Sequence, residues 1–403
     1  MNFIDIPDFI KYNITYRLKS FFELDIINNQ KLLEKRINNK SVLVIGGAGT
    51  IGSSFIDALL IFKPKKLVVV DYNENGLTEL TRNLRSKAGQ YIPEEYITYP
   101  MDFGDNVFEK MFDEIGPFNI VANFAAHKHV RSEKDKYSIE AMLENNVFKA
   151  KKFLDILLKN KPEHFFCVST DKAANPVNVM GASKKLMEEV IMSYSHKLNI
   201  TTARFANVAF SNGSLLAGYI ERIFKKQPIS CPIDIERYFV SPEESGHICL
   251  LACILGDSGD IYFPKFESKE LSSFKKITEK FFKALGRNIM ECKSEEQAKL
   301  IASNLKDSDA YPVFYFKSET SGEKLFEEFY TKDDKLDVKS YKGLGVIKNS
   351  VKPLLFDIEK TLDLLKLNMS SPTYNKESII KNLKEHLINF KHVETGKNLD
   401  QKM

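Results

Sequence analysis

A cluster of glycines between an apolar run and a helical pattern constrains this chain more than any other feature. Residues 41–45 are apolar, the cluster includes Gly46, Gly49 and Gly52, and a helical pattern follows through Phe62. This order is typical of a strand, a tight turn and a helix whose start holds a pyrophosphate. Gly46 permits the turn, Gly49 allows a phosphate to approach the backbone, and Gly52 lets helix and strand pack closely.

The residues around this turn predict the kind of dinucleotide. Thr50 and Ile51 open the helix, where backbone amides and the positive end of the helix dipole face the phosphates. Asp71 ends the next predicted strand, about 20 residues after Gly52, where a carboxylate accepts hydrogen bonds from a ribose 2′-hydroxyl and repels a 2′-phosphate. NAD is therefore favoured over NADP, although Asp71 could instead cap a loop. Asp102 either contacts the adenine or is a turn residue.

Further apolar runs predict the fold class. Residues 66–70, 118–124, 164–169 and 200–205 are short apolar stretches that alternate with helical patterns. Strands that alternate with helices form a parallel sheet covered on both faces. We therefore expect an α/β fold with a Rossmann-type, doubly wound parallel sheet, whose ligand lies beyond the carboxyl ends of the strands.

Changes of pattern along the chain predict four segments. They are a helical extension over 1–40, an NAD-binding domain over 41–206, a substrate-binding region over 207–290 interleaved with the last strands, and a C-terminal extension over 291–403. The first segment is either an oligomerisation arm or a packed extension.

Composition excludes several classes of protein. The chain has 58 basic and 54 acidic side chains and no basic stripe interleaved with aromatics, so we expect no nucleic-acid partner. Apolar runs stay short of the roughly 20 residues that cross a bilayer, and the N-terminus does not resemble a signal peptide. Five cysteines form no Cys-x-x-Cys pair, which suits reducing conditions. We expect a cytoplasmic protein.

Two further segments carry groups suited to proton transfer. Thr170, Asp171 and Lys172 place a hydroxyl, a carboxyl and an amine at the end of a predicted strand. Met180 and Lys184 lie one turn apart at the start of a predicted helix, so their side chains share a face. The carboxyl end of a parallel strand is the edge at which such a sheet binds its ligand. These residues are therefore the candidates for catalysis.

These segments resemble the nucleotide-sugar 4,6-dehydratases of bacterial polysaccharide biosynthesis, a group of extended short-chain dehydrogenases/reductases. The resemblance spans roughly residues 40–265 and is most specific in the Ser-Thr-Asp-Lys block and the Asn-Val-Met-Gly-Ala-Ser-Lys block that follows it. It is strongest toward the branch of UDP-N-acetylglucosamine 4,6-dehydratases whose larger members are membrane-anchored. The matching stretches are 46–52, 123–130, 146–147, 169–184 and 204–207.

One residue departs from the pattern of the wider superfamily. That pattern is Tyr-x-x-x-Lys, and Met180 occupies the tyrosine position. A thioether cannot exchange a proton, so the usual base for the sugar 4-hydroxyl is missing. The resemblance nevertheless implies activity, because members of the membrane-anchored branch also carry methionine there.

The resemblance implies a reaction and a role for each candidate. A hydride leaves carbon 4 of the sugar for NAD, water is lost across carbons 5 and 6, and the hydride returns to carbon 6. Lys172, uncharged when it acts, removes the carbon 5 proton, and Asp171 protonates the leaving hydroxyl. Thr170 hydrogen-bonds the 4-oxygen and Lys184 binds the nicotinamide ribose. The group that takes the 4-hydroxyl proton stays open, with Asp171, directly or through water, as the first candidate.

Other residues are candidates for binding. Asn207 and Arg237 are expected at the diphosphate or uridine of the substrate, since guanidinium forks suit phosphate; a surface salt bridge is the alternative for Arg237. Lys128 and His129 are expected to contact the substrate, and Ala125 the cofactor. We expect no metal, because His127 and His129 lack a third ligand at a recognisable spacing. Asn146 is either structural or catalytic.

The leading hypothesis is an NAD-dependent lyase that dehydrates a UDP-N-acetylhexosamine, most simply UDP-N-acetylglucosamine, to a 4-keto-6-deoxy sugar. The alternatives are an epimerase, a dehydratase that inverts carbon 5, or an enzyme that uses a GDP-sugar. A non-catalytic NAD-binding sensor or scaffold is the alternative of another class, and the acid-amine pair argues against it. The resemblance also implies a homo-oligomer.

Overall fold

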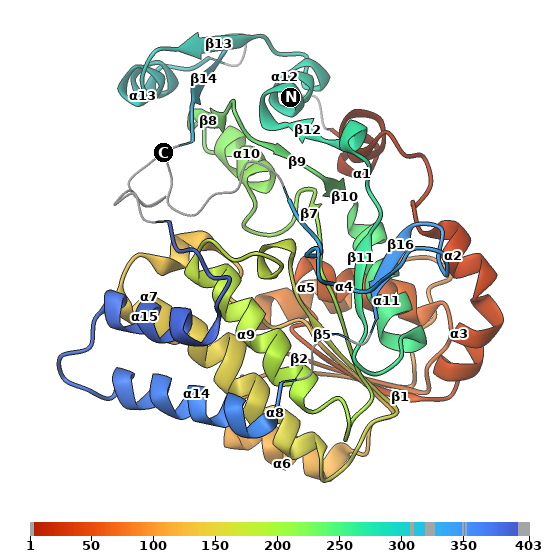
Figure 1. The fold of residues 1–403 in the computed structure, drawn as a ribbon. Helices are drawn as coiled ribbons and strands as arrows, with labels where there is room; N and C mark the ends of the chain where they lie inside the picture. Colours follow the sequence, from red (N-terminus) through yellow and green to blue (C-terminus); the bar gives the residue numbers. More distant parts are fainter. Residues whose placement is uncertain (1–3, 307–309, 319–326, 349, 351–352, 394–403) are drawn as a thin grey trace.

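The chain folds into a large sheet covered by helices, with a smaller lobe above it (Figure 1). The computed structural model describes residues 4–306, 310–318, 327–348, 350 and 353–393. Within these residues, no helix is both long and apolar enough to cross a membrane.

Parallel strands form the centre of the main sheet. They are, in spatial order, β3 (Glu95–Pro100), β2 (Lys66–Asp71), β1 (Ser41–Ile45), β4 (Ile120–Asn123), β5 (His164–Val168), β6 (Ile200–Ala203) and β11 (Ile261–Pro264). Two antiparallel strands complete the far edge, β16 (Leu344–Ile347) and β15 (Leu336–Asp337). Buried β1, β2, β4, β5 and β6 coincide with the predicted apolar runs. The expected α/β class with a Rossmann-type parallel sheet is confirmed.

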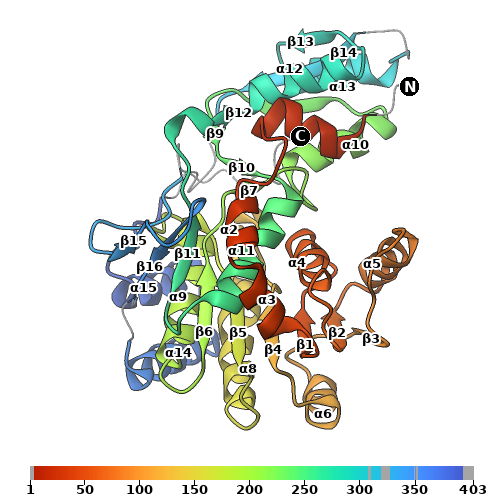
Figure 2. The same cartoon turned by 90° about the vertical axis from the view of Figure 1, so that its right-hand side faces the viewer.

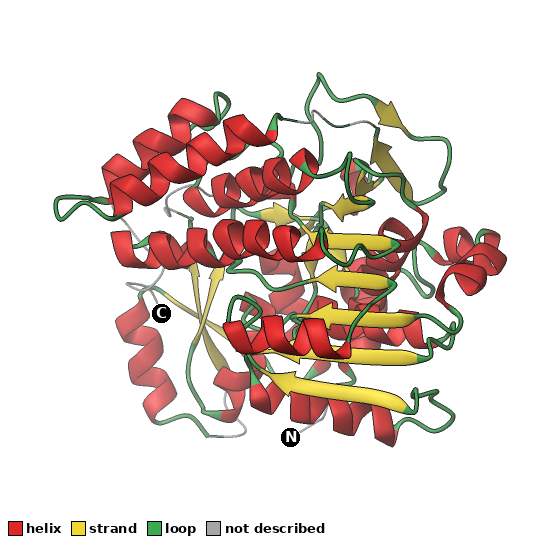
Figure 3. Cartoon of the chain, turned by 90° about the horizontal axis from the view of Figure 1, so that it is seen from below, coloured by secondary structure: helices red, strands yellow, loops and turns green. Residues whose placement is uncertain are grey.

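Helices cover both faces of this sheet (Figures 2 and 3). Helices α4 (Thr50–Leu60) and α11 (Pro242–Leu255) pack together, whereas α8 (Lys149–Leu157) packs against α9 (Val179–Ser193). The connection β1–α4–β2 and the connections β4–α8–β5–α9–β6 run in opposite directions across the sheet, so right-handed crossovers place α4 and the α8–α9 pair on opposite faces. Helices α5 (Glu74–Ser86), α6 (Asn106–Ile115) and α7 (Lys136–Leu143) also belong to the part of the chain around the main sheet.

The smaller lobe has its own sheet and its own apolar core (Figures 1 and 2). Its three parallel strands are β13 (Ile289–Cys292), β14 (Tyr311–Phe316) and β8 (Ile229–Pro232). Helices α10 (Leu215–Phe224), α12 (Phe274–Ala284) and α13 (Glu295–Ser303) accompany them. Two short ladders join the lobes: β10 (Phe239–Val240) pairs with β7 (Asn207–Val208), and β12 (Ser272–Ser273) with β9 (Glu236–Arg237).

The N-terminal segment packs on its own chain. It contains α1 (Ile6–Phe9), the π-helix η1 (Ile10–Thr15), α2 (Glu23–Asn28) and α3 (Gln30–Ile37). Arg17 forms a bidentate pair with Glu244 at 2.6 and 2.7 Å, and buried Asp25 accepts backbone hydrogen bonds from Lys342 and Gly343. These contacts are those of a packed extension, one of the two predicted roles, and the role of an oligomerisation arm stays a prediction.

The described residues after 290 contribute strands to both sheets and an outer layer of helices. Strand β14 pairs with β8 in the small sheet, and β16 pairs with β11 in the main sheet. Helices α14 (Leu355–Met369) and α15 (Lys376–His386) form an outer layer, α14 against α9 and α15 against α7. The predicted boundary at 290 does not separate these residues from the rest of the chain. The pairing strands lie far apart in the sequence, so no local pattern could indicate that they pair.

Candidate active site

The predicted site residues gather at one edge of the main sheet. Because the central strands are parallel, their carboxyl ends meet at one edge. The glycine turn follows β1, Asp71 ends β2, Asp102 follows β3 and Ala125 follows β4. The residues predicted to be catalytic, from Thr170 onward, follow β5, at the centre of the same edge.

The glycine turn has the geometry that a dinucleotide requires. Gly46 has a φ of +71°, which favours glycine, and a Cβ there would lie 2.6 Å from the backbone nitrogen of Ala125. A Cβ on Gly52 would lie 2.4 Å from the carbonyl oxygen of Gly46. Beside Gly49, in contrast, an added Cβ would meet only that oxygen, at 3.4 Å, among the described residues.

The start of α4 is open to an anion. Gly49 is the residue before the helix, and among the described residues no side chain caps the first backbone amides. Uncapped amides at a helix start are a ready site for phosphate. Thr50 and Ile51 supply two of these amides, so the turn fits the pyrophosphate of NAD.

Asp71 lies against the same turn. Its carboxylate accepts hydrogen bonds from the backbone nitrogens of Ala48, at 3.0 Å, and Asn73, at 2.9 Å. Burial raises the pKa of Asp71, and these hydrogen bonds oppose the rise. A carboxylate has about four acceptor positions, so these two bonds leave capacity for ribose hydroxyls.

Asp102 makes contacts typical of a turn residue. One of its oxygens accepts the backbone N–H of Gly104 at 2.8 Å, and the other pairs with the Lys149 ammonium. The structure therefore shows the turn role that the sequence left open, and a contact of Asp102 with adenine stays a prediction.

Asn146 fixes the loop that follows β4. Its side-chain oxygen accepts the N–H of His127 at 2.8 Å, while its amide donates to the carbonyl of His127 and to the Ser183 hydroxyl, at 3.0 and 3.1 Å. The loop, which includes Ala125, is thereby joined to α9. These contacts are structural, as one of the two predicted roles of Asn146 requires.

The acid and the amine are in direct contact. The Lys172 ammonium lies 3.1 Å from one Asp171 oxygen and 3.4 Å from the other, and the Thr170 hydroxyl donates to Asp171 at 2.7 Å. Asp171 is only 3% exposed, whereas Lys172 is half-buried. This cluster stands at the carboxyl end of β5, in the short helix η4 (Asp171–Ala173).

Met180 and Lys184 lie on buried turns of α9. Asn178 caps this helix by accepting the N–H of Gly181, which sets its first turn beside the cluster. The Lys184 ammonium donates to the carbonyl of Val168 at 2.6 Å, at the end of β5, and burial lowers the pKa of Lys184. Its contact with the nicotinamide ribose stays a prediction.

A buried ion pair joins α9 to the residue that follows β6. Arg204 binds Glu188 in a bidentate pair at 2.9 and 2.8 Å, and the Ser169 hydroxyl donates to Glu188 at 2.6 Å. Burial opposes ionisation of Glu188, yet the Arg204 charge and these hydrogen bonds hold its pKa below the usual value. Sequence patterns did not indicate this pair, because its members belong to different elements.

The residues predicted to bind the substrate lie where the lobes meet. Asn207 begins β7, and buried Arg237 ends β9, beside that junction. Lys128 donates to the carbonyl of Asn212 at 3.0 Å, and the His129 ring lies against Gly213. Arg237 is 5% exposed, so an ion pair of this residue would be buried rather than at the surface. The substrate contacts of all four residues stay predictions.

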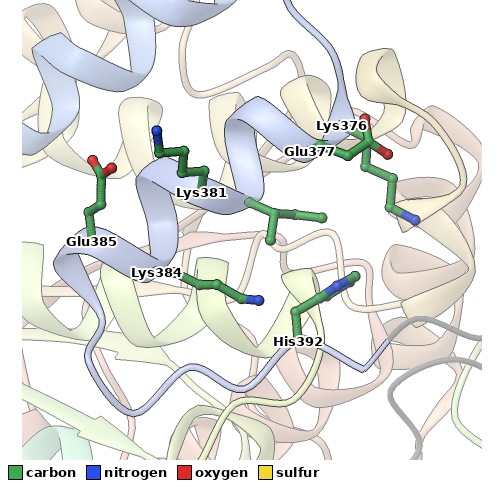
Figure 4. A pocket seen from close by; sticks show the side chains of 7 residues that line it. Lys376, Glu377, Lys381, Lys384, Glu385 and His392 are labelled. Atoms are coloured by element: carbon green, nitrogen blue, oxygen red, sulfur yellow. The ribbon is translucent and has the colours of Figure 1, made fainter.

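The hollow in Figure 4 is separate from this edge. It lies on α15, and its described lining residues are Lys376, Glu377, Ile380, Lys381, Lys384, Glu385 and His392. None of them was predicted for the site, and the charges of both signs are typical of a solvated helix face.

Comparison with known proteins places the chain in a family. The sequence profile of the family described as polysaccharide biosynthesis protein matches residues 42–349. The chain belongs to this family. The match includes the glycine turn, the acid-amine pair and most of the smaller lobe.

Relatives span different lengths. An uncharacterized membrane protein of Methanocaldococcus jannaschii is 29% identical over 86% of this chain and 96% of its own length. The capsular polysaccharide biosynthesis protein CapD of Staphylococcus aureus is 27% identical over 74% of this chain, which spans only 49% of CapD. A UDP-N-acetylglucosamine 4,6-dehydratase (inverting) of Campylobacter jejuni is 24% identical over 59% of this chain and 70% of its length.

Solved structures share the fold. Pen from Bacillus thuringiensis superposes with a TM-score of 0.64 at 20% identity, over 88% of this chain and 98% of Pen. DesIV from Streptomyces venezuelae, a dTDP-glucose 4,6-dehydratase solved with NAD and TYD bound, superposes with a TM-score of 0.55 at 18% identity, over 72% and 88% of the two chains. At these identities the likeness shows the fold alone.

One buried carboxyl of this family member was missed by the sequence reasoning. Glu327 is 8% exposed, and one of its oxygens accepts the N–H of Tyr238 at 3.0 Å. Burial and the negative charge of Asp171 raise the pKa of Glu327 to about 8. The segment around it gave no catalytic pattern, since its relation to Asp171 arises only when the chain folds.

Proposed function

We propose that this protein catalyses the NAD-dependent 4,6-dehydration of a UDP-N-acetylhexosamine, with UDP-N-acetylglucosamine as the first candidate. The product is a 4-keto-6-deoxy sugar nucleotide for glycan synthesis. The observation that carries the proposal is the contact between Asp171 and Lys172 at the carboxyl end of β5, on the edge that also holds the glycine turn. The Campylobacter relative named as a 4,6-dehydratase supports it.

The residues of the glycine turn fit NAD, and the chemistry that NAD supplies when bound is a reversible acceptor for the hydride of sugar carbon 4. Gly49 leaves room for its pyrophosphate, which the amides at the start of α4 would hold, and Gly46 and Gly52 allow the tight turn that places these amides. Asp71 holds the adenosine ribose.

The acid-amine pair carries the protons. Thr170 and Asp171 hold the sugar 4-oxygen, and Asp171 takes its proton, directly or through water. The Lys172 amine removes the carbon 5 proton, which an adjacent ketone has made acidic. Asp171 then protonates the hydroxyl that leaves carbon 6. Asp171 thus takes the place of the tyrosine that Met180 replaces.

Epimerisation is the second candidate function. Relatives named UDP-glucose 4-epimerase include one from Rickettsia canadensis, 29% identical over 60% of this chain. An epimerase returns the hydride to carbon 4 and needs no elimination, so an amine beside the acid would have no proton to remove from carbon 5. The pair therefore favours dehydration.

Mass spectrometry distinguishes these functions. Purified protein with NAD and UDP-N-acetylglucosamine should give a product lighter by one water. Asp171→Asn should lower turnover by at least about 100-fold, since general acid–base catalysis contributes 10²–10⁴-fold, while NAD binding is retained. An isomer of unchanged mass indicates an epimerase, and an inert wild-type protein that binds NAD indicates a sensor. Unchanged turnover of Asp171→Asn would remove Asp171 from the mechanism.

A further inference from the structure

Glu327 belongs to a part of the chain that is remote in sequence from every predicted catalytic residue. It follows the small lobe's strand β14 and precedes β15, on a segment that two hydrogen bonds fix at the main sheet. The Arg204 guanidinium donates to the carbonyl of Phe329 at 2.8 Å, and the Asn175 amide donates to Glu328 at 3.2 Å. The Phe329 ring packs against Phe263 of β11. The position of Glu327 is therefore determined by the fold.

The two oxygens of Glu327 have different surroundings. One accepts the backbone N–H of Tyr238, beside Arg237 at the junction of the lobes. The other is buried and has no hydrogen-bond partner among the described residues. A buried polar atom without a partner is costly, and such atoms often mark a place for a ligand or a proton. Among the described residues, Asp171, Lys172 and Arg237 are the charged groups that act most strongly on this carboxyl.

A proton count shows what a second carboxyl could do. The reaction begins with Asp171 ionised, to accept the 4-hydroxyl proton, and with Lys172 uncharged, to accept the carbon 5 proton. Asp171 passes its proton to the hydroxyl that leaves carbon 6 as water, and Lys172 returns its proton to carbon 5 as carbon 6 receives the hydride. The groups end as they began. The Lys172 nitrogen lies 3.1 Å from Asp171, and the proton that an uncharged Lys172 lacks needs another group to hold it.

We propose that Glu327 is a third proton-holding group of this site. It is neutral while Asp171 is ionised, and it holds the proton that Lys172 lacks when Lys172 acts as the base. This inference rests on the proposed function. Glu327 acts through the protonation of Lys172 and Asp171, and it is therefore a positioning residue. An ammonium cannot remove a proton, so Lys172 acts as the base only when its proton resides on another group, and a neutral Glu327 holds it.

The pH dependence follows from the groups around Glu327. Burial and the charge of Asp171 favour its neutral form to about pH 8, whereas Lys172, Arg237 and the N–H of Tyr238 favour the ionised form. Other titratable groups act on these neighbours: Glu270 and Tyr330 on Tyr238, and Asp334 on Arg204. Wild-type turnover should therefore fall about tenfold between pH 7 and pH 9, as expected for one ionisation near pH 8.

The test compares Glu327→Gln with Glu328→Gln. Glutamine keeps the shape of the neutral acid and cannot ionise, so the alkaline fall in turnover should move to higher pH in Glu327→Gln. The neighbouring Glu328 is half-buried and bound by Asn175, and Glu328→Gln should keep the wild-type profile. An alkaline fall that is the same in wild type and Glu327→Gln would overturn the proposal.

A second readout needs no substrate. Infrared difference spectra of the NAD-loaded protein at pH 7 should show the carbonyl band of a protonated carboxyl that Glu327→Gln removes and Glu328→Gln retains. Loss of this band should follow a titration near pH 8. Absence of the band from wild type at pH 7 contradicts the role of Glu327 even if dehydration is observed. Presence of the band in a protein that does not dehydrate the sugar would refute the proposed function and leave the protonation of Glu327 established.

Discussion

Gly52 shows how a single position controls cofactor binding. A Cβ there would lie 2.4 Å from the Gly46 oxygen and 2.8 Å from the Gly47 Cα, both of them backbone atoms. The glycine turn must therefore shift in Gly52→Ala. We expect NAD affinity to fall at least about tenfold, which corresponds to about 1.4 kcal/mol, measured by calorimetry.

Ser53→Ala is the matched control for this substitution, because Ser53 lies on the same helix and its hydroxyl bonds only the carbonyl of Thr50 among the described residues. Its NAD affinity should stay within about twofold of wild type, as is usual for small surface changes. Equal NAD affinities of Gly52→Ala and wild type would show that the turn does not hold the pyrophosphate.

Residues whose role depends on local sequence could be predicted; those that depend on distant partners could not. Gly46 follows β1 directly, Gly49 lies in the same turn and Asp71 ends β2, so the strand pattern alone predicted their common edge. The charge of Asp171 acts on Glu327 only because the chain returns to the main sheet after the small lobe. Its neighbour Glu328 has the same residue type and no such environment, so composition could not single Glu327 out.

At the scale of elements, the stability of β5, β6 and α9 depends on the buried pair of Glu188 and Arg204. Both side chains are at most 3% exposed, and the pair has two hydrogen bonds. Glu188→Leu should leave the Arg204 charge buried without a carboxylate, at a cost of about 3–5 kcal/mol. Chemical denaturation measures this change.

Exposed pairs provide the control for Glu188. Glu221 and Lys225 form an i,i+4 pair on α10 in which both side chains are more than half exposed. Glu221→Gln should change the free energy of unfolding by less than about 0.5 kcal/mol. Similar losses in Glu188→Leu and Glu221→Gln would contradict the structural role of the buried pair.

Elements with strong local patterns matched the prediction, and weaker ones did not. The apolar runs at β1, β2, β4, β5 and β6 are buried strands of the main sheet. Strand β3 lies at the edge and is only partly buried, so its sequence lacks the continuous apolar run that identified the others. The short strand β16 joins the sheet by pairing with β11. The residues of β16 alone carry little information about this pairing.

In the whole molecule, both ends of the chain contribute to the region around the site. The N-terminal segment bridges the lobes, since Arg17 binds Glu244 and the carbonyl of Phe239, while Asp25 holds the turn before β16. The C-terminal helices α14 and α15 cover the outer side of α7 and α9. The sequence predicted separate extensions at both ends. These contacts could not be predicted from it, because they join residues more than two hundred positions apart in the chain.

The central claim is that one hydride moves from carbon 4 of the sugar to carbon 6 while water is lost. UDP-N-acetylglucosamine carrying deuterium at carbon 4 tests it most directly, with the NAD-loaded protein and product analysis by NMR. The proposed dehydratase should give a 4-keto product whose carbon 6 methyl group contains the deuterium. Deuterium found only at carbon 4 of an isomerised sugar would contradict dehydration and identify an epimerase.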